Sequence, residues 1–133
     1  VTRFGEHGGP ARPEDFGVGP VTDAATLAQA VQAVKAVTIA PQIIDYVVRL
    51  VRATRESADL ATGASPRAAV MLANAARSRA ALQGRDYVLP DDVKALATAV
   101  LRHRLLLSPA AEIEGRQIEA LVAELIERTE APR

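Results

Sequence analysis

The sequence predicts an all-α fold, a small bundle of about five helices. Aromatic residues make up only 3% of a chain that is 49% hydrophobic, so the core must be built from Ala, Val, Leu and Ile. Such side chains suit closely packed helices. From residue 23 onward, apolar residues recur at spacings of three and four, which is the period of an amphipathic helix. Prolines stand where several of these periodic segments begin, a position that helices tolerate.

Length and charge narrow the classes of function. The chain has 133 residues, enough for one compact domain and too few for a nucleotide-binding α/β core with a second domain. Sixteen basic residues balance sixteen acidic ones, so no net field attracts nucleic acid or an anionic membrane. Without cysteine there is no disulfide framework or thiolate metal site. Because no bilayer-spanning run or signal-peptide pattern is present, we expect a cytoplasmic protein.

Residues 1–21 are expected to form a linker or a partly disordered leader. Glycine and proline are concentrated there, in the turn signals GGP at 8–10 and GVGP at 17–20. Both phenylalanines, Phe4 and Phe16, also lie in this segment. The segment either docks on a surface outside this sequence or stays partly disordered. The helical domain then comprises residues 22–133.

Five helices are expected in that domain. The first begins at Asp23, which can cap it, the second at Pro41, the third at Ser65 and Pro66, and the fourth at Pro90. The last has the most regular apolar stripe. Taken together, the residues expected to face the core are Leu27, Val31, Val34, Ile43, Ile44, Val47, Val48, Val51, Val93, Leu96, Ala97, Val100, Ile118, Leu121, Val122, Leu125 and Ile126.

Two details concern the ends of these helices. Gly84 is expected to end the third helix in the left-handed conformation. Residues 105–107 are short and apolar, so they could pair with residues 87–89 in a minimal two-stranded ribbon or extend the preceding helix. Periodicity does not separate these alternatives; we expect the ribbon.

No complete catalytic or metal-binding pattern is present. The sequence lacks a Gly-x-x-x-x-Gly-Lys-[Ser/Thr] phosphate loop and an apolar strand ending in Asp-Glu that would hold magnesium. His7 and His103 are far apart, and no Ser-His-Asp or paired-carboxylate arrangement is organised by a helix face or strand. We therefore expect no catalytic residue, no metal site and no ATP hydrolysis by this chain alone.

One arginine is unusual in its position. Arg67 falls in the first turn of the helix that begins at Ser65 and Pro66. A cation there opposes the helix dipole, whereas an anion beside the free amides is favoured. A phosphate that binds at this helix start would explain the placement of Arg67. Alternatively, Arg67 is an ordinary exposed side chain or pairs with a carboxylate such as Asp59.

Several motifs together resemble the C-terminal part of MoxR-type AAA+ ATPases. They are GASPRA at 63–68, GRDYV at 84–88, PDDVK at 90–94, HRL at 103–105 and EIEG at 112–115. Their order makes the resemblance specific from about residue 22 to residue 115, while the flanking segments match only in general character. Leu89 departs from the family pattern, which usually has a Thr or Ser that caps the next helix, a cap worth about 1 kcal/mol.

The resemblance implies an AAA+ lid that packs beside the ATPase core of a ring-forming, hexameric motor. It assigns Arg67 to the sensor 2 position, as a contact for the phosphate of ATP, with Ser65 and Pro66 as the cap that aims it. Loss of the γ-phosphate would then swing the lid. ATP with magnesium is implied for the parent protein, and none is expected on this chain alone. Chaperone-like maturation of client proteins and von Willebrand factor A partners are also implied.

The sequence does not define the client, the oligomeric state of this chain, or whether Arg67 serves its own subunit or a neighbour. Arg102, His103 and Arg104 are a second candidate for subunit or nucleotide contacts. A basic cluster at a helix end, however, also suits the helix dipole.

Two other classes of function stay open. The first is a helical protein-interaction module that needs no nucleotide. The second is a nucleic-acid binder that uses Arg49, Arg52 and Arg55, which share one helix face. Neutral net charge and the neighbouring Glu56 and Asp59 argue against this second alternative.

Overall fold

The computed structural model describes residues 12–132. The chain forms two compact units, divided between residues 31 and 32. The expectations for Phe4, His7 and the turn at 8–10 lie outside the described residues. Within residues 12–132, no helix is long and apolar enough to cross a membrane.

The first unit contains one turn of 3-10 helix and the beginning of a longer helix. The turn, η1 (Pro13–Phe16), ends at Gly17 with φ 72°. Helix α2 (Ala24–Ala36) begins where the sequence predicts, because Asp23 Oδ1 accepts a hydrogen bond from the Thr26 N–H at 2.7 Å. Contrary to prediction, α2 contains no buried residue.

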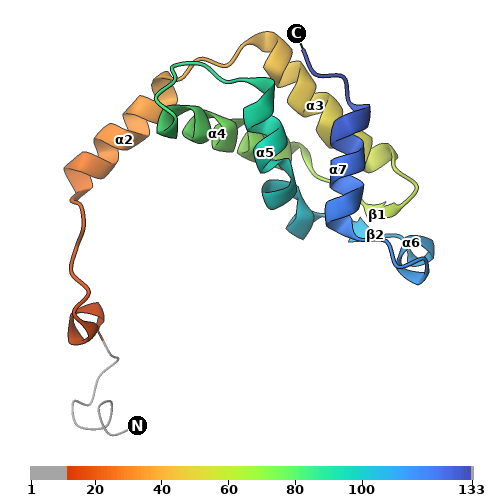
Figure 1. Cartoon of the computed structure of the whole chain (residues 1–133), viewed down its shortest axis with the longest axis horizontal. Coiled ribbons are helices and arrows are strands. Elements are labelled where there is room, and N and C mark those ends of the chain that lie inside the picture. The colour runs from red at the N-terminus through yellow and green to blue at the C-terminus, as the bar shows by residue number, and fades with distance from the viewer. Residues whose placement is uncertain (1–11, 133) are drawn as a thin grey trace, which may run out of the picture. The chain divides into compact units, whose positions relative to one another are not determined.

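The second unit is a helical bundle with a small ribbon at one end (Figure 1). Four helices enclose its core: α3 (Pro41–Glu56), α4 (Pro66–Leu82), α5 (Pro90–Leu101) and α7 (Ile118–Arg128). Helix α4 packs against α3 and α5, and α7 contacts the same two helices. The predicted all-α class is confirmed.

Proline marks the beginning of four α-helices among residues 12–132. Pro41, Pro66 and Pro90 open α3, α4 and α5 as predicted, because their fixed φ suits the first helical turn. Pro109 opens α6 (Pro109–Ile113), which the prediction of about five helices did not include. Helix α6 has only five residues, too few to display an apolar stripe in the sequence.

The buried face of α3 is rotated from the predicted one. Its buried residues are Ile43, Tyr46, Val47, Leu50, Val51 and Thr54. Ile44 and Val48, expected in the core, are exposed. The apolar run in this helix is nearly continuous, so two overlapping faces both show helical spacing, and packing against the neighbouring helices selects the one with Tyr46 and Leu50.

The other core faces largely follow the prediction. Small side chains on α4 let α3 and α5 approach closely, since Ala68, Ala76 and Ala80 are fully buried. On α5 and α7 the buried apolar residues are Val93, Ala97, Leu101, Leu121, Val122, Leu125 and Ile126. Leu96, Val100 and Ile118 are partly buried against this core.

The two-stranded ribbon is present but has a different first strand. Strand β1 (Leu60–Thr62) pairs antiparallel with β2 (Leu106–Leu107). The predicted pairing of residues 87–89 with residues 105–107 is wrong. Tyr87 instead forms an isolated parallel bridge with Thr38. Strand β1 is too short to show strand alternation, and the glycine that follows it makes the segment read as a break.

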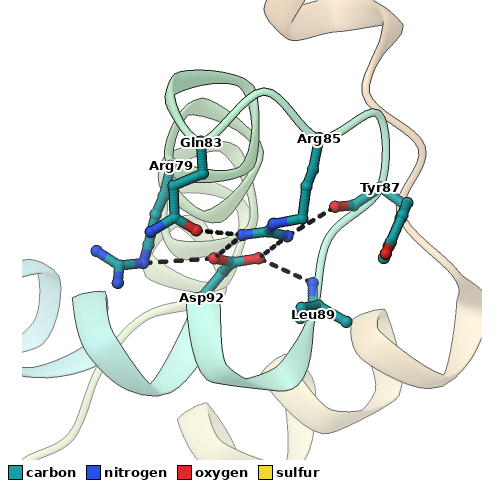
Figure 2. A network of polar contacts seen from close by, with 6 residues as sticks. All are labelled: Arg79, Gln83, Arg85, Tyr87, Leu89 and Asp92. Atoms are coloured by element: carbon teal, nitrogen blue, oxygen red, sulfur yellow. Dashed lines mark hydrogen bonds and ion pairs between the residues drawn. The ribbon is translucent and has the colours of Figure 1, made fainter.

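An ion pair with a buried carboxylate joins the end of α4 to the beginning of α5 (Figure 2). Gly84 ends α4 with φ 70°, as predicted, and the chain turns to present Arg85 to α5. The guanidinium of Arg85 donates two hydrogen bonds to the Asp92 carboxylate, at 2.8 and 2.7 Å. We call this pair the Arg85–Asp92 clamp.

Asp92 of the clamp also supplies one of the two hydrogen bonds of a capping box at the start of α5, while the bond from a side chain at Leu89 is missing. The Leu89 N–H donates to Asp92 Oδ2 at 2.9 Å, so the carboxylate satisfies an amide at the start of α5 from inside the helix. Arg79 Nε lies 3.3 Å from the other carboxylate oxygen. The hydrogen bonds from Arg85 outweigh burial and lower the pKa of Asp92 below its ordinary value.

Candidate functional site

Arg67 is an exposed cation in the first turn of α4. It follows Pro66, the first residue of the helix. Among the hydrogen bonds and ion pairs of residues 12–132, none involves the side chain of Arg67. A guanidinium that opposes the helix dipole without a carboxylate partner is available to an anion from outside this domain.

Ser65 occupies the N-cap position of α4 but does not cap it as predicted. Its backbone is extended, with φ −76° and ψ 163°, and its side chain makes no capping hydrogen bond. The Ser65 carbonyl oxygen instead accepts the Ala68 N–H at 2.9 Å. Since Pro66 has no N–H, few amides at this helix start remain for an anion, and the guanidinium of Arg67 is the main donor there.

The proposed alternative partner of Arg67 is engaged elsewhere. Asp59 Oδ2 lies 3.2 Å from Arg116 Nη2, and the same nitrogen lies 2.9 Å from Glu124 Oε2. Arg116 thereby ties the segment before β1 to α7. The alternative in which Asp59 pairs with Arg67 is not observed.

The segment that leads into α4 is held tightly against α3. A Cβ added to Gly63 would lie 2.6 Å from Arg55 Cγ and 2.7 Å from the Thr54 carbonyl oxygen, so only glycine fits without displacement. Ala64 is fully buried, and its N–H donates to Thr54 Oγ1 at 2.9 Å. These contacts therefore fix the backbone that leads into α4.

The two arginines of the basic triplet contact different helices. The triplet forms a 3-10 turn, η2 (Arg102–Arg104), after α5. Arg102 Nη1 lies 3.5 Å from Glu119 Oε1, an ion pair between exposed side chains. Arg104 Nη2 donates to Met71 Sδ at 3.1 Å, one helical turn beyond Arg67. Of the three, only Arg104 lies along the part of α4 that carries Arg67.

An open hollow of about 440 Å³ lies between η2 and the beginning of α7. Arg102, His103, Arg116 and Glu119 are among its lining residues, and Arg67 is not. Its arginines are paired with glutamates, which leaves it with little net attraction for an anion. Within residues 12–132, no group of three or more His, Asp or Glu side chains could hold a metal ion.

The three arginines of the nucleic-acid alternative are exposed on α3. Arg52 Nε lies 3.7 Å from Glu56 Oε1, which neutralises part of this row. The side-chain stem of Arg55 packs over Gly63. One of the three charges in this row is therefore compensated by an acidic neighbour, which weakens its attraction for a phosphate backbone.

Comparison with known proteins defines the class of this fold. A family model described as the AAA lid domain matches residues 52–125, more than half of the chain. The matched segment includes Arg67, the β1–β2 ribbon and the Arg85–Asp92 clamp. The chain therefore belongs to the AAA lid domain family.

The relatives narrow this class to one group of ATPases. The chain is 40% identical to the chaperone MoxR1 of Mycobacterium tuberculosis in an alignment of 100 residues that covers 68% of this chain and 26% of the relative. It is 42% identical over 90 residues to the protein YeaC of Bacillus subtilis, again 68% of this chain and 28% of the relative. The chain thus spans about a quarter of the length of these curated relatives.

A solved structure supports the same assignment. The crystal structure of a candidate ATPase from Cytophaga hutchinsonii shares the fold with a TM-score of 0.71 and 32% sequence identity. The match covers 77% of this chain and 34% of that chain. The fold and these relatives identify this chain as the C-terminal lid of a MoxR-type AAA+ ATPase.

Sequence reasoning missed Thr54, Gly63 and the Arg85–Asp92 clamp as parts of the site and its support. For Thr54 a signal existed, because it continues the three- and four-residue spacing of Val47 and Val51. The partner of its hydroxyl, ten residues further along the chain, leaves no trace in local periodicity.

Proposed function

We propose that this domain couples ATP binding and hydrolysis in an ATPase core to movement of the lid, with Arg67 as the sensor 2 contact for the terminal phosphate. The observation that carries the proposal is an exposed arginine at the beginning of α4 without any partner among residues 12–132. A cation at a helix start opposes the dipole, and an anion bound from outside the domain would offset this unfavourable placement.

The chemistry of the guanidinium suits this role. Its planar fork of donors matches the oxygens of a phosphoryl group, and its positive charge persists throughout the physiological pH range. After hydrolysis the γ-phosphate leaves and the contact is lost. The lid then changes its preferred position relative to the core, because a ligand shifts a conformational equilibrium only through contacts that differ between the two states.

The remaining parts of the proposal concern the whole protein. Its core would bind ATP with Mg²⁺ and assemble with neighbouring subunits into a ring, so Arg67 would contact either its own nucleotide or a neighbour's. One relative is named as a chaperone; by extension, we propose chaperone-like remodelling or maturation of client proteins in the cytoplasm, with von Willebrand factor A proteins as partners.

A comparison of three samples tests the coupling. We expect no steady phosphate release from the isolated chain. We expect the complete ATPase to hydrolyse ATP, and a version that lacks residues 22–133 to do so at least about tenfold more slowly, because the phosphate contact is lost. Turnover is measured by phosphate release. Undiminished turnover without the lid would instead favour a protein-interaction module that works independently of nucleotide.

A further inference from the structure

Thr54 carries a buried hydroxyl that connects two helices. Its side chain is fully buried, near the end of α3. Thr54 Oγ1 donates to the Val51 carbonyl oxygen at 2.7 Å and accepts the Ala64 N–H at 2.9 Å. Both hydrogen-bonding functions of the hydroxyl are thereby satisfied in the interior, where an unpaired polar group is costly.

This hydroxyl fixes the chain immediately before the arginine. Ala64 lies three residues ahead of Arg67, and the intervening Ser65 and Pro66 already have the backbone of a helix start. Gly63, on the other side of Ala64, packs its backbone against Thr54 and Arg55 at a distance that excludes any side chain. The side chain of Ser65 makes no capping bond, so the Thr54–Ala64 hydrogen bond is the polar tie that this connection makes to α3.

We propose that Thr54 is a positioning residue for Arg67, which it aims at the phosphate through the Ala64 amide. This inference rests on the proposed sensor function of Arg67. Guanidinium and phosphate must meet within hydrogen-bonding distance, and displacement by about 1 Å is enough to impair a catalytic arrangement. The far end of α4 is held separately by the Arg85–Asp92 clamp, so loss of the Thr54 hydroxyl loosens the end that bears the arginine.

The test uses Thr54→Val in the complete ATPase, because valine keeps the shape of threonine and removes both hydrogen bonds. We expect kcat for ATP hydrolysis to fall about 3- to 10-fold, with KM changing by less than about twofold. Thr54→Ser, which keeps the hydroxyl, should restore most of the activity. A Thr54→Val variant that does not fold is replaced by Thr54→Cys, whose thiol is a weaker acceptor.

A matched control comes from another threonine. Thr129 Oγ1 donates to the Leu125 carbonyl oxygen at 2.7 Å at the end of α7, away from the connection to α4. Thr129→Val removes a hydroxyl-to-carbonyl hydrogen bond like the one from Thr54 to Val51, and we expect it to leave kcat unchanged. An equal loss of kcat in Thr129→Val and Thr54→Val would mean that general destabilisation lowers turnover, and would overturn the positioning role.

Combining the variants separates this inference from the proposed function. If Thr54 acts through Arg67, Thr54→Val should have little further effect in an Arg67→Ala background. If Arg67→Ala lowers turnover but Thr54→Val has no effect, or the same effect in both backgrounds, only the positioning role is overturned. If Arg67→Ala itself leaves turnover unaltered, the sensor function fails, and the inference about Thr54 fails with it.

Discussion

Arg67→Ala in the complete ATPase is expected to lower kcat for ATP hydrolysis at least about 100-fold, the lower end of the range for removing one donor that stabilises a transition state. Helix content should not change, since the side chain is exposed and holds no other residue of the described part. Steady-state turnover and circular dichroism of the same samples measure the two quantities.

Two further variants show whether the effect depends on this arginine in particular. Arg67→Lys keeps the charge but loses the planar fork, so its turnover should lie between wild type and Arg67→Ala. Arg49→Ala removes another exposed arginine, on α3, and should leave turnover unchanged. Wild-type turnover in Arg67→Ala would reject the sensor role.

Asp92→Ala is expected to lower the free energy of unfolding of this domain by about 2 to 3 kcal/mol, because it removes a buried carboxylate that is hydrogen-bonded to Arg85 and leaves that arginine without its acidic partner. The Asp92 side chain is only 3% exposed and accepts hydrogen bonds from Arg85 and from the Leu89 N–H (Figure 2). Denaturant unfolding measures the loss.

The adjacent carboxylate is the matched control for this variant. Asp91 is 87% exposed and lies 3.9 Å from Lys94 Nζ. Exposed pairs of this kind contribute little, so Asp91→Ala should change the unfolding free energy by less than about 1 kcal/mol. Equal losses in the two variants would show that the clamp is no stronger than a surface pair.

Acid should weaken the clamp in the wild type. Hydrogen bonds from Arg85 lower the pKa of Asp92 in the folded state, so its carboxylate stabilises the fold at pH values above its unfolded pKa of about 4. That contribution is lost as the pH falls through the lower pKa of the folded state. Between pH 7 and pH 3, Asp92→Ala should therefore lose less stability than wild type; equal losses would contradict the lowered pKa.

Helix beginnings were the most predictable part of the fold. Pro41, Pro66 and Pro90 each restrict the backbone locally, and this local effect survives in the folded domain. The position of Arg67 on α4 could be read for the same reason. Features that depend on packing were harder to predict from the sequence. The sequence of α3 permits two apolar faces, and only the neighbouring helices decide between them.

Contacts between distant segments could not be predicted. Strand β1 pairs with residues more than forty positions away, and neither strand is long enough to show alternation. The hydroxyl cap expected from Ser65 is absent, whereas the hydroxyl of Thr54, on another helix, accepts a hydrogen bond from the N–H of the preceding residue, Ala64. Local pattern therefore located the candidate site, and the residues that support it became visible only in three dimensions.

The coupling of phosphate contact to lid position is tested most directly by a distance between the lid and the core of the complete ATPase. This chain contains no cysteine, and Leu82 at the end of α4 is 88% exposed, so Leu82→Cys provides a single labelling site in the lid. With a second spin label in the core, wild type should give different distances with a non-hydrolysable ATP analogue and with ADP. Arg67→Ala should give the ADP distance with both nucleotides; a full ATP-dependent shift in that variant would contradict the account.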